Sequence, residues 1–136
     1  MYKCEHFKIQ ELVPPSIYKI YGEFAWHFFD DRALITLDRL QDRYGTTIIN
    51  NWLWDGDRLW SGLRTPESPY YSPGSQHTFG RAFDCIFKEV SAEQVRKDLF
   101  DNPNDLTFKF INAVEADVPW FHFDSRNCKR IKVFKK

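Results

Sequence analysis

The chain has 136 residues, of which 43% are hydrophobic and 18% aromatic. This length and composition predict one domain, residues 1–136, whose core is large enough to fold without disulfides. Basic and acidic residues are balanced at 19 each, so no overall positive field favours a nucleic-acid partner. The sequence has neither an apolar run of membrane-spanning length nor the apolar core of a signal peptide. We therefore expect a monomer that is made in a cytoplasm and does not insert into a membrane.

The first half of the chain predicts one helix and one strand. Pro14 and Pro15 indicate an irregular start without an early helix over residues 6–29. Residues 30–45 are typical of a helix, with an aspartate suited to cap its start, leucines recurring on one face and a glycine at its end. Residues 46–54 are rich in β-branched and aromatic side chains and favour a strand.

A long loop and further strands follow. Residues 55–80 contain four glycines and three prolines among polar residues, which predicts a long loop of the kind that often carries function. We expect a short helix over residues 91–100, opened by a serine–glutamine capping box. Four more strands are expected, the first of them central because both its faces are apolar: 82–87, 106–114, 120–124 and, as an edge strand, 130–134. The pattern predicts an α+β fold with a mainly antiparallel sheet of four to five strands, flanking helices and a long loop.

Asp84 lies in the middle of the apolar segment 82–87, where a carboxylate is costly unless it is paired. The period-two alternation of a strand puts His122 on one face of its own segment together with Asp124. If the two strands are neighbours, opposed Cβ atoms lie about 5 Å apart, which allows Asp84 and His122 to bind one ion. The other interpretation is that Asp84 pairs with an arginine, such as Arg64 or Arg81, and that no metal binds.

His77 is the candidate third ligand. It reaches Asp84 only if the chain folds back between the two residues, and Gly80 stands where such a turn is least costly. Two imidazoles and one carboxylate, with a fourth position open, suit catalytic zinc.

Three motifs in this chain resemble those of the zinc D-alanyl-D-alanine carboxypeptidase and L-alanyl-D-glutamate endopeptidase family, which cleaves bacterial cell-wall peptides. Residues 75–84 have the form S-x-H-x-x-G-x-A-x-D, and residues 120–124 have the form aromatic-x-His-x-Asp. Residues 61–66 match S-G-[aromatic]-R-[ST]-P, except that Leu63 takes the aromatic position. The motifs occur in the family's order, and the compact chain looks most like bacteriophage members.

The resemblance implies a hedgehog/D,D-peptidase-like fold, one Zn²⁺ per chain and the stem peptides of peptidoglycan as substrate. It assigns the zinc ligands to His77, Asp84 and His122, and it assigns to Arg64 the orientation of substrate or stabilisation of the oxyanion. Such a zinc ion polarises the scissile carbonyl and lowers the pKa of a bound water. The expected setting is phage lysis or wall degradation, at the cell wall or periplasm or as a virion component.

The general base is less directly indicated. Many members of the family have a glutamate three residues before the last ligand, but Pro119 occupies that position here. Glu115 matches an arrangement seen in phage-like members and is the predicted base, with Asp117 as the alternative. Asp124 is a candidate catalytic residue that either holds a ligand or contacts substrate.

Polar and aromatic side chains near the motifs are candidate substrate-binding residues: Ser75, Gln76, Trp120, Tyr71 and Tyr70. Two other classes of function stay open at this point, because a fold does not guarantee a chemistry. One is a catalytically silent, zinc-containing module that binds the wall or builds a virion. The other is a metal-free interaction domain.

Overall fold

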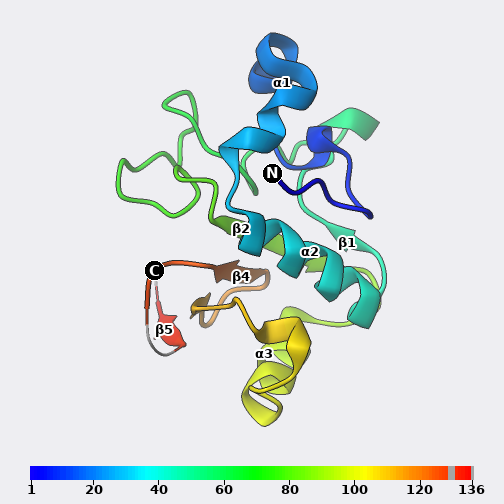
Figure 1. Cartoon of the computed structure of the whole chain (residues 1–136), viewed down its shortest axis with the longest axis vertical. Helices are drawn as coiled ribbons and strands as arrows, with labels where there is room; N and C mark the ends of the chain where they lie inside the picture. The colour runs from blue at the N-terminus through cyan, green and yellow to red at the C-terminus, as the bar shows by residue number, and fades with distance from the viewer. Residues whose placement is uncertain (129–130, 136) are drawn as a thin grey trace.

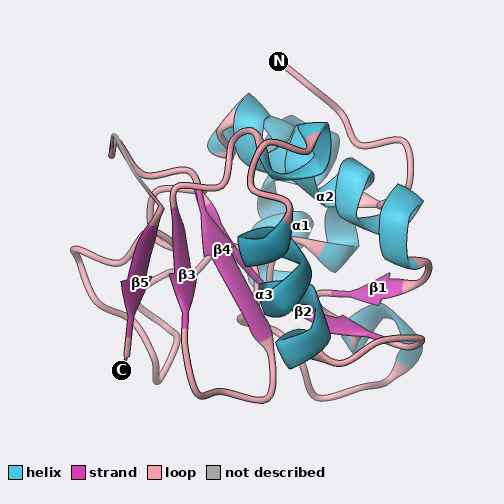
Figure 2. Ribbon diagram, turned by 90° about the horizontal axis from the view of Figure 1, so that it is seen from below, coloured by secondary structure: helices cyan, strands magenta, loops and turns pink. Residues whose placement is uncertain are grey.

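Five strands form one sheet in the computed structural model, which describes residues 1–128 and 131–135. Their order across the sheet is β1-β2-β4-β3-β5, which can be followed from right to left in Figure 2. All neighbours are antiparallel except β3 and β5, which are parallel. The strands are β1 (Thr47–Ile48), β2 (Ala82–Phe87), β3 (Ala113–Glu115), β4 (Phe121–Asp124) and β5 (Lys132–Phe134). The expected α+β fold with a mainly antiparallel sheet is thus confirmed.

Three α-helices accompany the sheet: α1 (Pro15–Tyr21), α2 (Asp31–Tyr44) and α3 (Ala92–Asp101). The caps predicted for the two longer helices are present. The Asp30 side chain accepts a hydrogen bond from the backbone N–H of Arg32 at the start of α2, and Ser91 and Gln94 form a reciprocal capping box at the start of α3. Four short 3-10 helices complete the set: η1 (Ile9–Glu11), η2 (Gly22–Phe28), η3 (Trp52–Trp54) and η4 (Leu106–Phe108).

The two faces of the sheet differ in chemistry. Apolar side chains of β2 and β4 join those of α2 and α3 in one buried core, to which Phe83, Phe121, Leu37 and Leu99 belong. Figure 1 shows α2 crossing the middle of the molecule and α3 lying below it. Because side chains alternate along a strand, the polar residues of β2 and β4 lie on the opposite face. That face is therefore available for a site.

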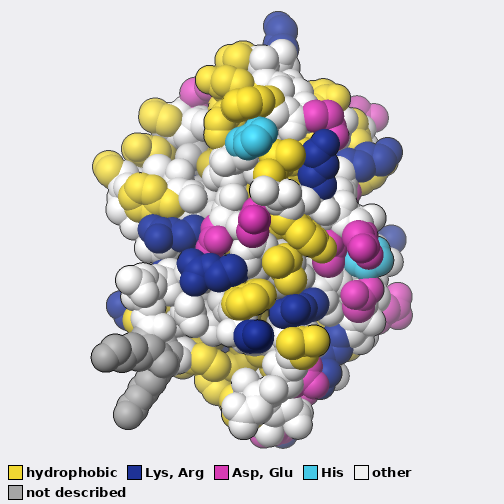
Figure 3. All heavy atoms as spheres, in the orientation of Figure 1, with side chains coloured by type: hydrophobic (Ala, Val, Ile, Leu, Met, Phe, Trp, Pro, Cys, Tyr) yellow, Lys and Arg dark blue, Asp and Glu magenta, His cyan; other side chains and the backbone are white. Residues whose placement is uncertain are grey.

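The N-terminal third differs from the expectation. Pro15 does not break a helix but begins one, since a proline at the first helical position lacks only an N–H that would be unpaired there anyway. The end of the molecule where α1 lies shows hydrophobic side chains at its surface in Figure 3. Ile20 and Phe24 are 70% and 58% exposed at this end.

The strand expected over residues 46–54 is also shorter than predicted. Only β1 pairs, and η3 takes the place of the second half. Two asparagine side chains explain the difference. They accept hydrogen bonds from the backbone of a loop, and the segment that contains them does not continue as a paired strand. Asn50 accepts from the N–H of Ser61 at 2.9 Å, and Asn51 accepts from the N–H of Arg58 at 2.8 Å.

The strand expected over residues 106–114 is likewise wrong over residues 106–112, since β3 begins at Ala113. Asp105 caps η4 by accepting a hydrogen bond from the N–H of Thr107 at 2.9 Å, so this segment turns and pairing begins only at β3. The expected edge strand 130–134 is present as β5, and residue 130 lies outside the described residues. The strand β5 lies at the edge of the sheet and pairs in parallel with β3.

The long loop is present as predicted, since the structure assigns no helix or strand between η3 and β2. The loop is anchored to the core by a hydrogen bond of 2.9 Å from the backbone N–H of Leu63 to the carbonyl of Leu12. In the described part of the chain, no helix combines the length and the apolar character needed to cross a bilayer.

Candidate metal centre and cleft

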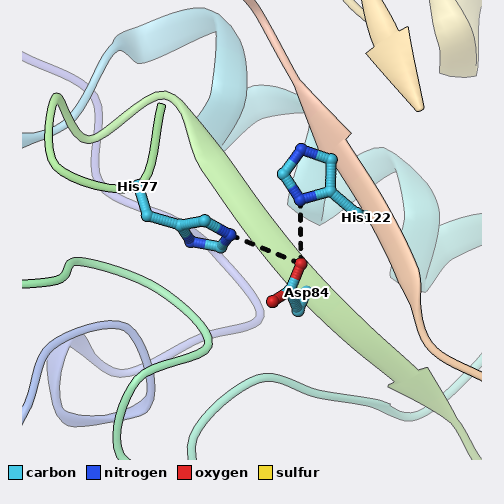
Figure 4. A group of neighbouring side chains, drawn as sticks. All are labelled: His77, Asp84 and His122. Carbon is cyan, nitrogen blue, oxygen red and sulfur yellow. Dashed lines mark hydrogen bonds and ion pairs between the residues drawn. The ribbon is translucent and has the colours of Figure 1, made fainter. Parts of the chain in front are cut away.

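The two central strands bring Asp84 and His122 face to face, as the alternation pattern predicted. The residues are register partners in the antiparallel β2–β4 pair, and Nδ1 of His122 lies 2.9 Å from Oδ1 of Asp84. His77 approaches the same oxygen from the loop, with its Nε2 3.4 Å away. Figure 4 shows both imidazoles directed at the carboxylate. All three side chains are buried.

The turn that returns His77 to the sheet depends on Gly80. This residue has φ +67°, which favours glycine. A Cβ atom at this position would also lie 1.9 Å from the carbonyl oxygen of Phe28. Ser75 supports the turn, because its hydroxyl accepts a hydrogen bond from the backbone N–H of His77 at 3.2 Å.

A backbone carbonyl orients the His77 ring. Nδ1 lies 2.9 Å from the carbonyl oxygen of Gly62, and a carbonyl can only accept a hydrogen bond. Nδ1 therefore carries the proton, and Nε2 presents its lone pair to the centre. Burial lowers the pKa of His77, which keeps the ring neutral, as a metal ligand must be.

His122 is oriented by a carboxylate. Its Nε2 lies 2.8 Å from Oδ2 of Asp124, so Nε2 carries a proton and Nδ1 is the atom directed at Asp84. Burial alone would lower the pKa of His122, but hydrogen bonds to Asp124 and Asp84 raise it to about 9. A metal ion that binds at Nδ1 must therefore displace the proton that this nitrogen shares with Asp84. Asp124 is fully buried and is held in turn by Arg126. This arrangement supports the expectation that Asp124 holds a ligand, and makes it a positioning residue.

Asp84 uses both of its oxygens. Oδ1 faces the two imidazoles, and Oδ2 accepts a hydrogen bond from Nη2 of Arg64 at 3.0 Å. Burial would raise the pKa of Asp84, but the two histidines lower it well below its usual range. The arginine partner considered from the sequence is therefore present as Arg64, in addition to the histidines.

The donor set fits a metal ion. One ligand atom from each of His77, Asp84 and His122 lies within 4.8 Å of the others. Two imidazole nitrogens and one carboxylate oxygen, each supported by an outer hydrogen bond, form the type of set that metal sites use. This buried group can bind a metal ion.

The centre opens into a cleft of about 790 Å³. Every residue predicted from the sequence to bind substrate borders it, together with Arg64 and Glu115. The lining residues that were not predicted as site residues include Arg58, Trp60, Arg126 and Phe134. The oxygen Oε1 of Gln76 is buried and has no hydrogen-bond partner among the described residues, so it can accept a donor from a ligand.

The geometry separates the two candidates for a base. Glu115 is only 7% exposed, lines the cleft and accepts a hydrogen bond from the indole of Trp120 at 3.0 Å. Asp117 has a side chain that is 70% exposed and forms an ion pair with Lys135 at 2.9 Å. Asp117 is not among the residues that line the cleft.

The fold and the site define an α+β domain in which two histidines and one carboxylate line a cleft and can bind a metal ion. No protein-family model, curated protein or solved structure matches this chain.

Proposed function

We propose that the protein is a zinc-dependent peptidase that hydrolyses a peptide bond in the stem peptides of bacterial peptidoglycan. The observation that carries the proposal is the meeting of a buried His77–Asp84–His122 group with Glu115 and Arg64 in one cleft. The three motifs that resemble the wall-peptidase family support it, because they contain the three candidate ligands and Arg64.

The proposal gives each side chain a chemical task. His77, Asp84 and His122 would hold the zinc ion, which would supply a Lewis acid and lower the pKa of a bound water. Glu115 would accept a proton from the water that attacks the scissile carbonyl carbon, and would pass that proton to the amine as the carbon–nitrogen bond breaks. The Arg64 guanidinium stabilises the negative charge that develops on the carbonyl oxygen.

The remaining lining residues suit an extended peptide. Gln76 offers a buried acceptor for a substrate N–H, and Trp120 and Tyr71 provide apolar walls with polar tips. Under this proposal the enzyme acts on the wall during phage lysis or as a virion component. The proposal covers either carboxypeptidase or endopeptidase cleavage.

The test is digestion of purified peptidoglycan by zinc-loaded protein, with products identified by mass spectrometry. New amine and carboxylate ends are expected, and they should vanish after chelation and in His77→Gln. His27→Gln is the matched control, since His27 is an exposed histidine outside the cleft.

Two results would contradict the proposal. Tight zinc binding without any product would favour the catalytically silent wall-binding or virion module, which the proline at position 119 keeps open. Protein that binds no metal, and whose melting temperature does not change with a chelator, would favour the metal-free interaction domain.

A further inference from the structure

Arg126 comes shortly after the end of β4 in the chain, and it lines the cleft together with His122. Its Nε donates to Oδ1 of Asp124 at 2.7 Å, and its Nη2 donates to Oδ2 of the same carboxylate at 2.7 Å. One face of the guanidinium lies over the ring of Phe134, 5.1 Å from the ring centroid. The buried carboxylate of Asp124 thus binds the guanidinium in the plane of the group, and the ring of Phe134 covers one of its faces.

The bidentate pair leaves one edge of the guanidinium unused. Asp124 occupies the edge formed by Nε and Nη2, so the edge formed by Nη1 and the second hydrogen of Nη2 remains. Within residues 1–128 and 131–135, Nη1 donates to no protein acceptor. This edge has the geometry that binds a carboxylate through two parallel hydrogen bonds. Because the side chain is already ordered, a ligand would not have to immobilise it.

The two arginines next to the candidate metal ligands are anchored to different strands. Arg64 bonds Asp84 on β2 and belongs to the long loop. Arg126 is linked to His122 on β4 through Asp124, and it stacks on Phe134 of β5. A ligand in the cleft can therefore meet a fixed cation at each of the two strands that carry the candidate ligands.

The charge of the cleft favours an anionic ligand. Three arginines and three carboxylates line it, so a divalent metal bound to the ligands leaves an excess of positive charge. Clefts of one sign attract substrates of the opposite sign.

We propose that Arg126 binds a carboxylate on the residue that flanks the scissile bond, with Asp124 and Phe134 holding the guanidinium in place. The inference rests on the proposed function and adds a specificity to it. Stem peptides carry such groups at two places, the α-carboxylate of D-glutamate and the carboxylate of the terminal D-alanine. Arg126 acts on the substrate, whereas Phe134 is a positioning residue.

The experiment combines protein variants with substrate variants. Two pairs of synthetic stem peptides are compared, in which either the D-glutamyl or the terminal carboxylate is free in one member and amidated in the other. Arg126→Gln should raise KM for the acid of one pair roughly 10- to 100-fold, as expected for a lost hydrogen-bonded ion pair. KM for the amide should not change. The pair that shows this difference identifies the carboxylate.

Phe134→Leu should also raise KM for the acid, but by a smaller factor. In this variant the Arg126 guanidinium still bonds to Asp124, but it no longer stacks on an aromatic ring. Val133→Ala is the matched control on the same strand, since Val133 is 52% exposed and does not line the cleft. Zinc content is measured for each variant, because Arg126 also holds Asp124. An equal loss on acid and amide in both pairs would assign Arg126 a purely structural role and overturn the inference.

The design separates this inference from the proposed function. If the wild-type protein cleaves none of the four peptides, the proposed function fails. Calorimetric titration with the same intact peptides then tests Arg126 directly. Tighter binding of an acid than of its amide, lost in Arg126→Gln, would support the carboxylate site, and equal affinities would refute it.

Discussion

The indole nitrogen of Trp120 donates a hydrogen bond of 3.0 Å to the carboxylate of Glu115, and both side chains border the cleft. The bond links the end of β3 to the start of β4 across the intervening turn. It holds the carboxylate at the cleft wall, while Asp117 in the same turn faces outward to Lys135.

The first prediction concerns this carboxylate. Glu115→Gln keeps the shape and the hydrogen bond to Trp120 but removes the base, so kcat on a soluble stem peptide should fall about 10²- to 10⁴-fold. Asp117→Asn, in the exposed part of the same turn, should leave kcat unchanged. A loss in Asp117→Asn as large as that in Glu115→Gln would move the base to Asp117.

The second prediction concerns the carboxylate behind His122. Asp124→Asn should weaken zinc binding about 10- to 100-fold, because the ring loses the charged partner that fixes Nε2–H and orients Nδ1. The dissociation constant is measured by competition with a chromophoric chelator. Asp31→Asn, at an exposed position on α2, serves as control and should bind zinc as the wild type does. Unchanged affinity in Asp124→Asn would contradict the positioning role.

The third prediction uses two glycines of the same loop. Gly80→Ala places a methyl group against the Phe28 carbonyl at positive φ, so the free energy of unfolding should fall by at least about 2 kcal/mol. Gly74→Ala meets no atom within 4 Å and should change stability by less than about 0.5 kcal/mol. Urea unfolding measures both. Equal stabilities would show that the turn before β2 relaxes freely.

The fourth prediction is a pH dependence away from the cleft. The hydrogen bond from Arg43 lowers the pKa of Asp98 below its usual range, and Tyr44 and Asn102 add to the effect. Because the folded pKa lies below the unfolded value of about 4, the stabilisation is present above that pH and is lost as the pH falls through the folded pKa.

Asp98→Asn should therefore lower the free energy of unfolding by about 1 kcal/mol near pH 7 and by less near pH 3, because pH 3 lies between the unfolded and the folded pKa. Asp101→Asn is the control, since Asp101 forms an ion pair with Lys97 on the exposed side of α3. Urea unfolding at the two pH values checks the difference. A cost that does not depend on pH would assign the effect of Asp98→Asn to packing.

Sequence signals from neighbouring residues predicted the elements whose formation depends mainly on those residues. Caps and apolar periodicity located α2 and α3, and apolar residues on both faces located the central strand β2. The error over residues 46–54 arose because contacts with a segment further along the chain decide the local backbone. Asn50 and Asn51 bind the 58–61 loop, and no pattern in residues 46–54 reports that contact.

The site was predictable to a similar degree. Strand alternation placed Asp84 opposite His122, and Gly80 indicated the turn that returns His77. The motif resemblance pointed to Arg64 and Glu115. The wall formed by Arg126 and Phe134 was missed, because it depends on the parallel pairing of β3 with β5. A strand of three residues carries no signal for its direction of pairing.

The pairing of β2 with β4 determines when, during synthesis, the candidate metal site can be completed. His122 follows Asp84 by 38 residues, and α3 and β3 lie between them in the chain. During synthesis, a ribosome has therefore already produced His77 and Asp84 while their partner has not yet been translated. A chain that ends before His122 holds only two of the three candidate metal ligands. The candidate site is therefore completed only after β4 has emerged from the ribosome and paired with β2.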